Sequence, residues 1–447
     1  MSDDQTNNFA VAVIGAGPAG IYAAKQLASN GVRVALINRD IKPGGLAEYG
    51  IYYTKHKMKE GLRKQFHRIL EMPEISYYGN VIVGKETGLS LEDLRNMGFQ
   101  ALMVTVGAQG TKWLGLPGEE LAGVFHAKDI VYFYNSLPPF SNQQCAFKDR
   151  VALIGVGNVM IDIAHWAIRD LKVEEVVAVA RRGPAEVKFT KKEMEYVAKN
   201  IDLQALDAEI DRVTERMQAV GQDPQAAKDF ILSALPKAEE PVSDTRFTFQ
   251  FLSSPSRILG DENGCVKGLE VEDTKLVPKN GDTKARGLDT KRVLDVDTVV
   301  FCIGDKVDEE FGLPVKWNEF VKNPKPEFPV DEISYEAYDP EMEKPVEGVF
   351  VAGWSREASS GLVGIARKDG ENGARALLSY LEARCTEVDA DSVFQSFEQY
   401  LKENFEGVVG KDGVQKLEEK ESEQAELLGV EGFKMKTNEE MLTAINK

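Results

Sequence analysis

The chain of 447 residues is poor in the features that mark several protein classes. Its four cysteines (Cys145, Cys265, Cys302 and Cys385) stand far apart and form no Cys-x-x-Cys pair, so we expect neither a redox dithiol nor a cysteine-bound iron–sulfur cluster. Four scattered histidines give no zinc-ligand spacing, and no metal site is expected. The sequence also has no apolar run long enough to cross a bilayer. Its polar, acidic first eight residues differ from a signal or transit peptide, so we expect a cytoplasmic protein.

Positive charge is scarce. The formal net charge is −18, which disfavours nucleic acid and anionic membranes as partners. Residues 386–447 contribute much of this excess, with 15 acidic and 7 basic side chains. One basic stretch is the exception, and it contains Lys55, Lys57, Lys59, Arg63, Lys64 and Arg68. This stretch is either a solvated helix face or a docking patch for an acidic partner.

Glycine is present in two informative turns about 140 residues apart. The first turn, Gly15-Ala-Gly17-Pro18-Ala19-Gly20, follows a short apolar strand and precedes a helical run. This pattern is typical of a dinucleotide fold, because backbone N–H groups and the positive helix end can face a pyrophosphate. An acidic residue for the ribose hydroxyls is expected at the end of the next strand. That position is Asn38, which can accept a hydrogen bond without carrying charge.

The second turn reads Gly155-Val-Gly157-Asn158-Val159-Met160. Met160 stands where a third small residue is usual, so we expect the helix to lie slightly away from the strand. Asn158 can offer its side-chain amide to phosphates. The next apolar strand ends in Arg181-Arg182. These arginines favour NADP, because guanidinium groups bind its 2′-phosphate well. The simpler alternative is that they are two arginines on a solvated turn.

Two dinucleotide cradles in one chain predict electron transfer between two dinucleotides. The sequence shows no constellation of a catalytic acid or nucleophile. A flavin needs none, because hydride can pass from nicotinamide to flavin through positioning alone. Without a dithiol, the electrons are expected to leave to a separate carrier, a quinone or oxygen.

The motifs resemble the adrenodoxin-reductase-like ferredoxin–NADP reductases, which are built like glutathione reductase. The Arg-Arg-Gly-Pro and Gly-Trp elements are more specific to this family than the glycine turns. The segments that carry the resemblance run in family order and are Val13–Gly20, Gly45-Leu46, Tyr78–Val81, Leu116–Phe125, Gly155–Val159 with Asp162, Arg181–Pro184, Phe189-Thr190 with Glu193, Gly353-Trp354, Gly361–Asp369 and Phe433–Thr437 with Glu440–Leu442.

The resemblance implies an α/β fold with two dinucleotide-binding, Rossmann-like domains, in which the NADP domain is inserted into a discontinuous FAD domain. The expected ranges are 1–109 and 326–385 for the FAD domain, 110–325 for the NADP domain and 386–447 for an acidic helical extension. FAD would bind the first cradle and NADP the second, with Gly361 where nicotinamide meets flavin. FAD would then release single electrons to a ferredoxin-like protein.

The expected cofactor-binding residues follow from the motifs together with the resemblance. For FAD they are Gly15, Gly17, Pro18, Ala19, Gly20, Asn38, Gly45, Leu46, Val83, Gly107, Gly353, Trp354, Gly361, Leu362 and Val363. For NADP they are Gly155, Gly157, Asn158, Val159, Met160, Arg181, Arg182 and Glu193. No catalytic side chain is predicted.

The chain also departs from the family pattern near the flavin. The arginine expected after Gly45-Leu46 is Glu48, and the family's Pro-Asp-His segment reads Tyr53-Thr54-Lys55. These departures alter the flavin's surroundings and bear on the electron acceptor. Two other functions therefore stay open at this point: reduction of a quinone or small molecule, and a flavin-bearing subunit of a larger electron-transfer complex.

Overall fold

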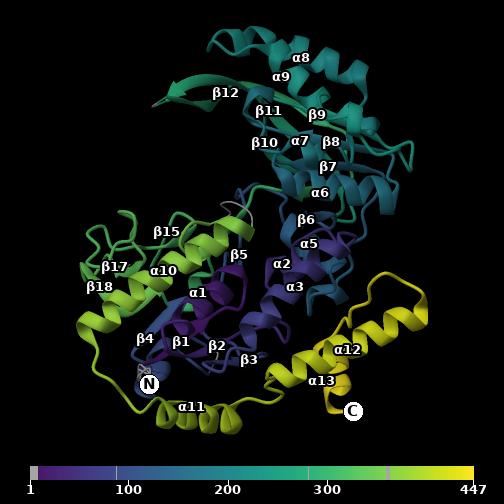
Figure 1. The fold of residues 1–447 in the computed structure, drawn as a ribbon. Coiled ribbons are helices and arrows are strands. Elements are labelled where there is room, and N and C mark those ends of the chain that lie inside the picture. Colours follow the sequence, from purple (N-terminus) through teal and green to yellow (C-terminus); the bar gives the residue numbers. More distant parts are fainter. Residues whose placement is uncertain (1–8, 87, 280, 359–362) are drawn as a thin grey trace. The chain divides into compact units, whose positions relative to one another are not determined.

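The structure is a computed structural model, and it describes residues 9–86, 88–279, 281–358 and 363–447. The chain forms two compact units, each with its own mainly parallel sheet (Figure 1). The first unit comprises Met1–Thr111, Tyr134–Asn142 and Asp305–Lys447, and the second comprises Lys112–Phe133 and Gln143–Gly304. The second unit is thus inserted into the first. The predicted fold class is confirmed.

The first unit contains a six-stranded sheet of order β17-β18-β4-β1-β2-β3. Its strands are β1 (Ala10–Ile14), β2 (Arg33–Ile37), β3 (Ile75–Tyr78), β4 (Ala101–Val104), β17 (Glu336–Asp339) and β18 (Lys344–Val351). The five strands from β18 to β3 are parallel, and β17 pairs antiparallel with β18. Every residue of β1 and β4 is buried, which explains why these strands are continuous apolar runs in the sequence.

Helices pack on both faces of this sheet. They are α1 (Pro18–Ala28), α2 (Leu46–Tyr49), α3 (His56–Leu70), α4 (Leu91–Asn96), α10 (Val363–Arg384), α11 (Ala390–Asn404), α12 (Lys411–Leu428) and α13 (Asn438–Asn446). One core joins α1, α3, α10, α12 and α13 to the sheet through residues such as Leu27, Leu377 and Leu417. The other core contains Phe394 and Phe397 of α11.

The bounds of the two units differ from the expected domain ranges, mainly at three segments. Residues 386–447 belong to the first unit, because α11 packs in one core of its sheet while α12 and α13 pack in the other. Residues 305–325 also lie in the first unit, where Phe311 and Phe320 are buried in its core. Residues 134–142 are the third such segment.

The second unit has a parallel sheet of order β6-β13-β7-β8-β9 and an antiparallel sheet of order β10-β11-β12. The strands are β6 (Val124–His126), β7 (Arg150–Ile154), β8 (Glu175–Val179), β9 (Arg246–Gln250), β10 (Ser253–Gly260), β11 (Val266–Lys279), β12 (Asp282–Leu294) and β13 (Thr298–Phe301). The helices are α5 (Ala127–Tyr134), α6 (Asn158–Trp166), α7 (Lys191–Met194), α8 (Leu203–Gln218) and α9 (Pro224–Leu232).

Short elements complete the fold. The short strands are β5 (Gly110–Thr111), β14 (Asp305–Lys306), β15 (Val315–Lys316) and β16 (Glu319–Phe320). The short helical turns are η1 (Phe140–Asn142), η2 (Ala167–Leu171), η3 (Pro184–Glu186), η4 (Ala198–Asn200), η5 (Leu235–Lys237), η6 (Glu309–Phe311) and η7 (Gly353–Ser355). Within the described ranges, every helix is too short or too polar to cross a membrane.

Candidate functional site

The first glycine turn joins β1 to α1, as the sequence predicts. Gly15 has a φ of +102°, and a Cβ atom added to it would lie 2.5 Å from the carbonyl oxygen of Thr105. A Cβ atom on Gly20 would lie 1.9 Å from the carbonyl oxygen of Gly15. Only glycine fits at these two positions, because the strand ends and the helix approach too closely for a side chain.

Gly17 has a different role in the same turn. Its backbone is extended, and a Cβ atom there would meet no atom of the described residues within 4 Å. Gly17 is the N-cap of α1, and no side chain in the described part of the chain caps this helix end. The first amide groups of α1 therefore lie beside open space at the positive end of the helix. This arrangement fits the pyrophosphate of a dinucleotide.

Glycines of three other segments lie against the start of α1. Gly45, just before α2, has a φ of +50°, and its Cβ position lies 3.0 Å from Gly17 Cα. Gly353 begins η7, and its Cβ position lies 2.6 Å from Ala19 Cβ. Gly370 of α10 approaches the same residue, with its Cβ position 2.1 Å from the carbonyl oxygen of Ala19. The structure thus brings together glycines that are more than 300 residues apart in the sequence.

The remaining residues predicted for the first cradle are placed as follows. Gly107 lies just after β4 with a φ of +73°. The Val83 side chain is buried in a core of the first unit. Val363 is the first residue of α10, and Gly361-Leu362 lie outside the described residues.

Asn38 follows β2 as expected, but its side chain is engaged within the protein. Its Oδ1 accepts the N–H of Ala16 at 3.0 Å. Its Nδ2 donates to the carbonyl oxygens of Asp40 and Lys42 at 2.9 and 3.0 Å, and lies 3.2 Å from the Tyr77 hydroxyl. Only 7% of the residue is exposed. Asn38 therefore ties the glycine turn to the loop after β2 and does not reach out towards a ribose.

The second glycine turn repeats the design of the first between β7 and α6. Gly155 has a φ of +128°, and its Cβ position lies 2.3 Å from the carbonyl oxygen of Cys302. Gly157 is the extended N-cap of α6, and its Cβ position has no neighbour within 4 Å among the described residues. Each turn thus begins with a closed glycine, Gly15 or Gly155, that shapes the turn, and two residues later has an open glycine, Gly17 or Gly157, that faces a cradle.

Three residues follow Gly157 at the start of α6. Asn158 Oδ1 accepts the N–H of Thr190 at 2.8 Å, so its NH₂ group is the part that it can offer to a phosphate. Val159 is 44% exposed at this helix end. Met160 is fully buried, so its bulky side chain packs inside the unit and does not line the cradle.

The two arginines lie at the end of β8. Their backbones are fixed, because the carbonyl oxygen of Arg181 accepts the Thr274 hydroxyl at 2.7 Å and that of Arg182 accepts the N–H of Leu252 at 3.0 Å. The Arg181 side chain is exposed. Arg182 Nη1 lies 3.6 Å from Asp282 Oδ2, an exposed partner that a phosphate could replace. The predicted Glu193 lies on α7 in the same unit.

Comparisons with known proteins agree with this geometry. The sequence pattern of the family described as pyridine nucleotide-disulphide oxidoreductase matches residues 9–227. NADPH-ferredoxin reductase FprA of Mycobacterium leprae is 28% identical over 83% of this chain and 84% of its own length. The mitochondrial NADPH:adrenodoxin oxidoreductase of Arabidopsis thaliana is 28% identical over 79% of this chain and 78% of its own.

A solved structure shows the same fold. Mycobacterium tuberculosis FprA in complex with NADPH gives a TM-score of 0.81 at 24% identity, covering 98% of this chain and all of that one. The chain belongs to the adrenodoxin-reductase and FprA-like ferredoxin–NADP reductase family. It is therefore a flavoprotein oxidoreductase of the ferredoxin-reductase type. The predicted resemblance is confirmed.

The basic stretch of this family member is divided between the inside and the outside of the first unit. Lys59 is only 3% exposed, and its Nζ donates to Asn135 Oδ1. Arg63 makes two hydrogen bonds to the carboxylate of Glu48, at 2.5 and 2.6 Å. Lys59 is therefore not part of an exposed docking patch, and the prediction of a patch that includes it is wrong. The basic side chains of the stretch that remain exposed are Lys57, Lys64 and Arg68.

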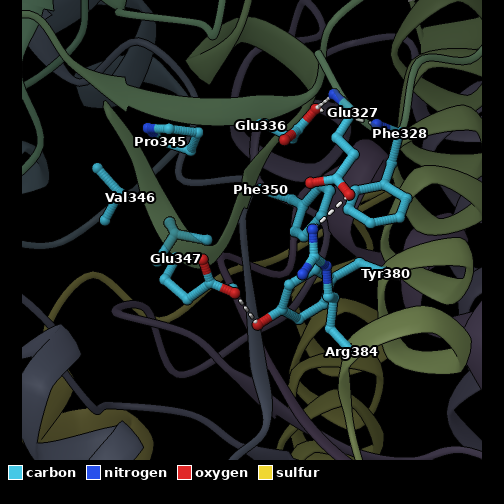
Figure 2. Close-up of a pocket in the computed structure, with 11 residues that line it drawn as sticks. Glu327, Phe328, Glu336, Pro345, Val346, Glu347, Phe350, Tyr380 and Arg384 are labelled. Atoms are coloured by element: carbon cyan, nitrogen blue, oxygen red, sulfur yellow. Dashed lines mark hydrogen bonds and ion pairs between the residues drawn. The ribbon is translucent and has the colours of Figure 1, made fainter. Parts of the chain in front are cut away.

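A second feature of the first unit is a small pocket between β18 and α10 (Figure 2). Tyr380 donates its hydroxyl to Glu347 at 2.8 Å, and Arg384 pairs with Glu327 beside it. The cavity volume is about 30 Å³. Such a volume holds one or two water molecules and is too small for a cofactor or substrate.

Two groups of functional interest were missed at the sequence level. Asp369 belongs to the matching Gly361–Asp369 motif, yet nothing in the sequence shows that it binds the backbone of Gly353. Glu48 stood out as a departure from the family pattern, and the sequence gave no sign of its partner Lys434. Both groups depend on contacts between distant segments.

Proposed function

We propose that the protein transfers hydride from NADPH to FAD and passes single electrons from FAD to a ferredoxin-like protein. FAD would occupy the cradle of the first unit, and NADPH that of the second. When bound, FAD supplies two-electron chemistry towards a nicotinamide and one-electron chemistry towards a carrier. A cytoplasmic location stays part of this prediction.

The observation that carries the proposal is the difference between the two cradles. Both present an open N-cap glycine to a pyrophosphate, Gly17 in one unit and Gly157 in the other. Only the second has two arginines after its next strand, with one side chain exposed and one paired to an exposed carboxylate. This pair supports NADP over NAD, because guanidinium groups complement a 2′-phosphate. The relatives carry NADPH in their names, which supports the same choice.

The protein's own residues supply binding and positioning. The first amide groups of α1 and α6 would hold the two pyrophosphates, and Arg181 with Arg182 would bind the 2′-phosphate. Asp369 holds the turn at Gly353 that lies against α1. A catalytic acid or base is not required, since hydride transfer between two cofactors depends on their distance and orientation.

The electron acceptor is supported by the names of the relatives, which are ferredoxin and adrenodoxin reductases. The exposed basic groups Lys57, Lys64 and Arg68 leave a smaller candidate docking patch than the sequence indicated. Reduction of a quinone or small molecule is therefore the second candidate function. A flavin-bearing subunit is the third, and stoichiometric co-purification of a partner would identify it.

A stopped-flow experiment distinguishes these functions. Holoprotein reduced with one equivalent of NADPH is mixed with an oxidised ferredoxin or with a water-soluble quinone, at low and high ionic strength. We expect ferredoxin to be reduced in one-electron steps at a rate that falls with salt, because screening weakens the attraction between charged surfaces. Rapid, salt-insensitive reduction of the quinone without ferredoxin reduction would contradict the proposal.

A further inference from the structure

A buried charge cluster lies next to the first cradle. Glu48, near the end of α2, is only 2% exposed. Its carboxylate binds Arg63 of α3 at 2.5 Å and Lys434 of the C-terminal tail at 2.7 Å. Burial alone would raise the pKa of Glu48, but the cations Lys434, Lys42 and Arg63 hold it well below its usual range. The carboxylate is therefore ionised and compensated by several cations.

The tail residue Lys434 makes more than one contact with α2. Its Nζ donates to the carbonyl oxygen of Glu48 at 2.9 Å and lies 4.6 Å from the ring centroid of Tyr49. The neighbouring residue is also fixed, because the N–H of Met435 donates to Glu421 at 3.0 Å. Glu421 in turn binds the buried Lys42 at 2.5 Å. The tail is thus tied to both ends of residues 42–49.

The position of α2 needs such external contacts. A helix of four residues cannot be stable by itself, because nucleation of a helix costs more than one turn returns. Yet α2 starts directly after Gly45, whose Cβ position lies 3.0 Å from Gly17 Cα in the first cradle. A shift of α2 would therefore move Gly45 relative to the first cradle.

The same tail segment borders a cavity beside the first cradle's sheet. Asn438 and Met441 of α13 line a cavity of about 280 Å³ together with Tyr49 of α2. Arg39 and Asn80 line it too, and they follow β2 and β3. Dinucleotides bind α/β sheets at the carboxyl ends of such strands. The tail thus lies along the edge of the sheet where a dinucleotide is expected.

We propose that Lys434 is a positioning residue of the flavin site, which acts through Glu48 to hold α2, and with it Gly45 and Leu46, against the first cradle. The proposal rests on the proposed function, since it takes FAD as the ligand of that cradle. It assigns a role to the C-terminal tail: residues 429–447 complete the flavin-binding unit. It also explains Glu48, because an arginine at this position would join the three cations Lys42, Arg63 and Lys434 with no acid between them.

The test compares four variants of the full-length holoprotein. K434M removes the charge and keeps the length of the side chain, and K434R keeps the charge. K436M changes an exposed lysine two residues away. K411M removes a contact of the preceding helix α12, the hydrogen bond from Lys411 Nζ to the carbonyl oxygen of Met72 at 3.1 Å. Three quantities are measured: the rate of FAD release, from the flavin fluorescence that appears, the visible circular dichroism of bound FAD, and the melting temperature.

We expect K434M to release FAD at least about tenfold faster and to alter the visible spectrum, because it leaves a buried carboxylate short of one cation. K434R should stay close to wild type, as should K436M. K411M should keep the wild-type spectrum even if its melting temperature falls as far as that of K434M. If K434M binds FAD and shows the release rate and spectrum of the wild type, this proposal is wrong and the proposed function is unaffected. A wild-type protein that binds no FAD would overturn the proposed function as well.

Discussion

The backbone N–H of Gly353 donates to Asp369 Oδ2 across 2.6 Å, so that α10 fixes the turn that carries Trp354. Arg356 donates to the same carboxylate at 2.7 and 3.0 Å, and the Tyr335 hydroxyl lies 3.2 Å from it. The carboxylate and Arg356 are both largely buried. This one side chain therefore organises the turn that lies against the first cradle.

We predict that Asp369→Asn lowers the stability of the protein and disturbs the bound flavin. The amide keeps the shape but leaves Arg356 without its charged partner, which costs about 2–4 kcal/mol for a largely buried pair. The free energy of unfolding in urea and the absorption spectrum of bound FAD measure the two effects. Glu371→Gln on the same helix is the control, because its partner Arg367 is half exposed and such a pair contributes at most about 1 kcal/mol. Equal behaviour of the two variants would contradict the assignment.

Valine at the open glycines should remove one cofactor each without unfolding the protein. Gly17 and Gly157 have extended backbones, and a side chain there would enter open space. We expect Gly17→Val to lose FAD and Gly157→Val to keep FAD but lose NADPH binding. Flavin content and NADPH titration measure these losses. Gly15→Ala is the contrasting variant, since it clashes with backbone and should fail to fold. A Gly17→Val protein with full FAD content would show that FAD lies elsewhere.

The double variant Arg181→Ala, Arg182→Ala should weaken NADPH binding by about 10- to 100-fold and leave NADH almost unchanged, because the lost pairing is to the 2′-phosphate. Dissociation constants for both nucleotides measure the difference. Arg169→Ala is a suitable control, since Arg169 is a half-exposed arginine of the same unit that pairs with Glu239. A similar loss of affinity for NADPH and NADH would refute the assignment of the 2′-phosphate site.

Asn38→Asp should destabilise the protein although it restores the acidic residue usual for this position. The aspartate would direct an oxygen at the carbonyl oxygens of Asp40 and Lys42, which now accept hydrogen bonds from Asn38. We expect a loss of about 1–3 kcal/mol in the free energy of unfolding, because buried acceptors lose their donor and face a charge. Asn30→Asp on the surface should change little. Tighter FAD binding by a fully stable Asn38→Asp protein would contradict our interpretation.

Buried Lys59 should make stability rise with pH. Burial, with the nearby cation Lys434, lowers the pKa of Lys59 from 10.5 to about 6. Between these values the unfolded chain binds the proton and the folded chain does not, so the free energy of unfolding increases with pH. Lys59→Met should reduce this increase between pH 6.5 and 9, and the exposed Lys57→Met should not. Identical pH profiles for wild type and Lys59→Met would show that Lys59 is charged when folded.

The glycine turns could be predicted from sequence because their physics is local. Gly15 and Gly155 need a positive φ and a close approach to a strand end, and both demands leave a readable pattern along the chain. Which side of α3 faces the core was harder to predict. Met58 is 51% exposed, whereas its neighbour Lys59 takes the inward position and its Nζ donates a hydrogen bond to Asn135 Oδ1. A buried, hydrogen-bonded lysine breaks the apolar pattern on which such predictions rest.

Contacts between distant segments could not be predicted. Lys434 and Glu48 are 386 residues apart, and their pairing depends on where α12 and the tail pack. The position of Asn38 at the end of β2 was predicted correctly, whereas its side chain is directed by the glycine turn and the loop after β2. The sequence thus located the two glycine turns, and the structure was needed to show which residues hold them in place.

The most direct test is an anaerobic titration of the purified protein with NADPH, followed by visible absorption. We predict a yellow protein that is bleached by about one equivalent of NADPH and only poorly by NADH, as hydride transfer between two bound cofactors requires. A colourless protein, or a bound flavin that NADPH leaves oxidised, would contradict the proposed function.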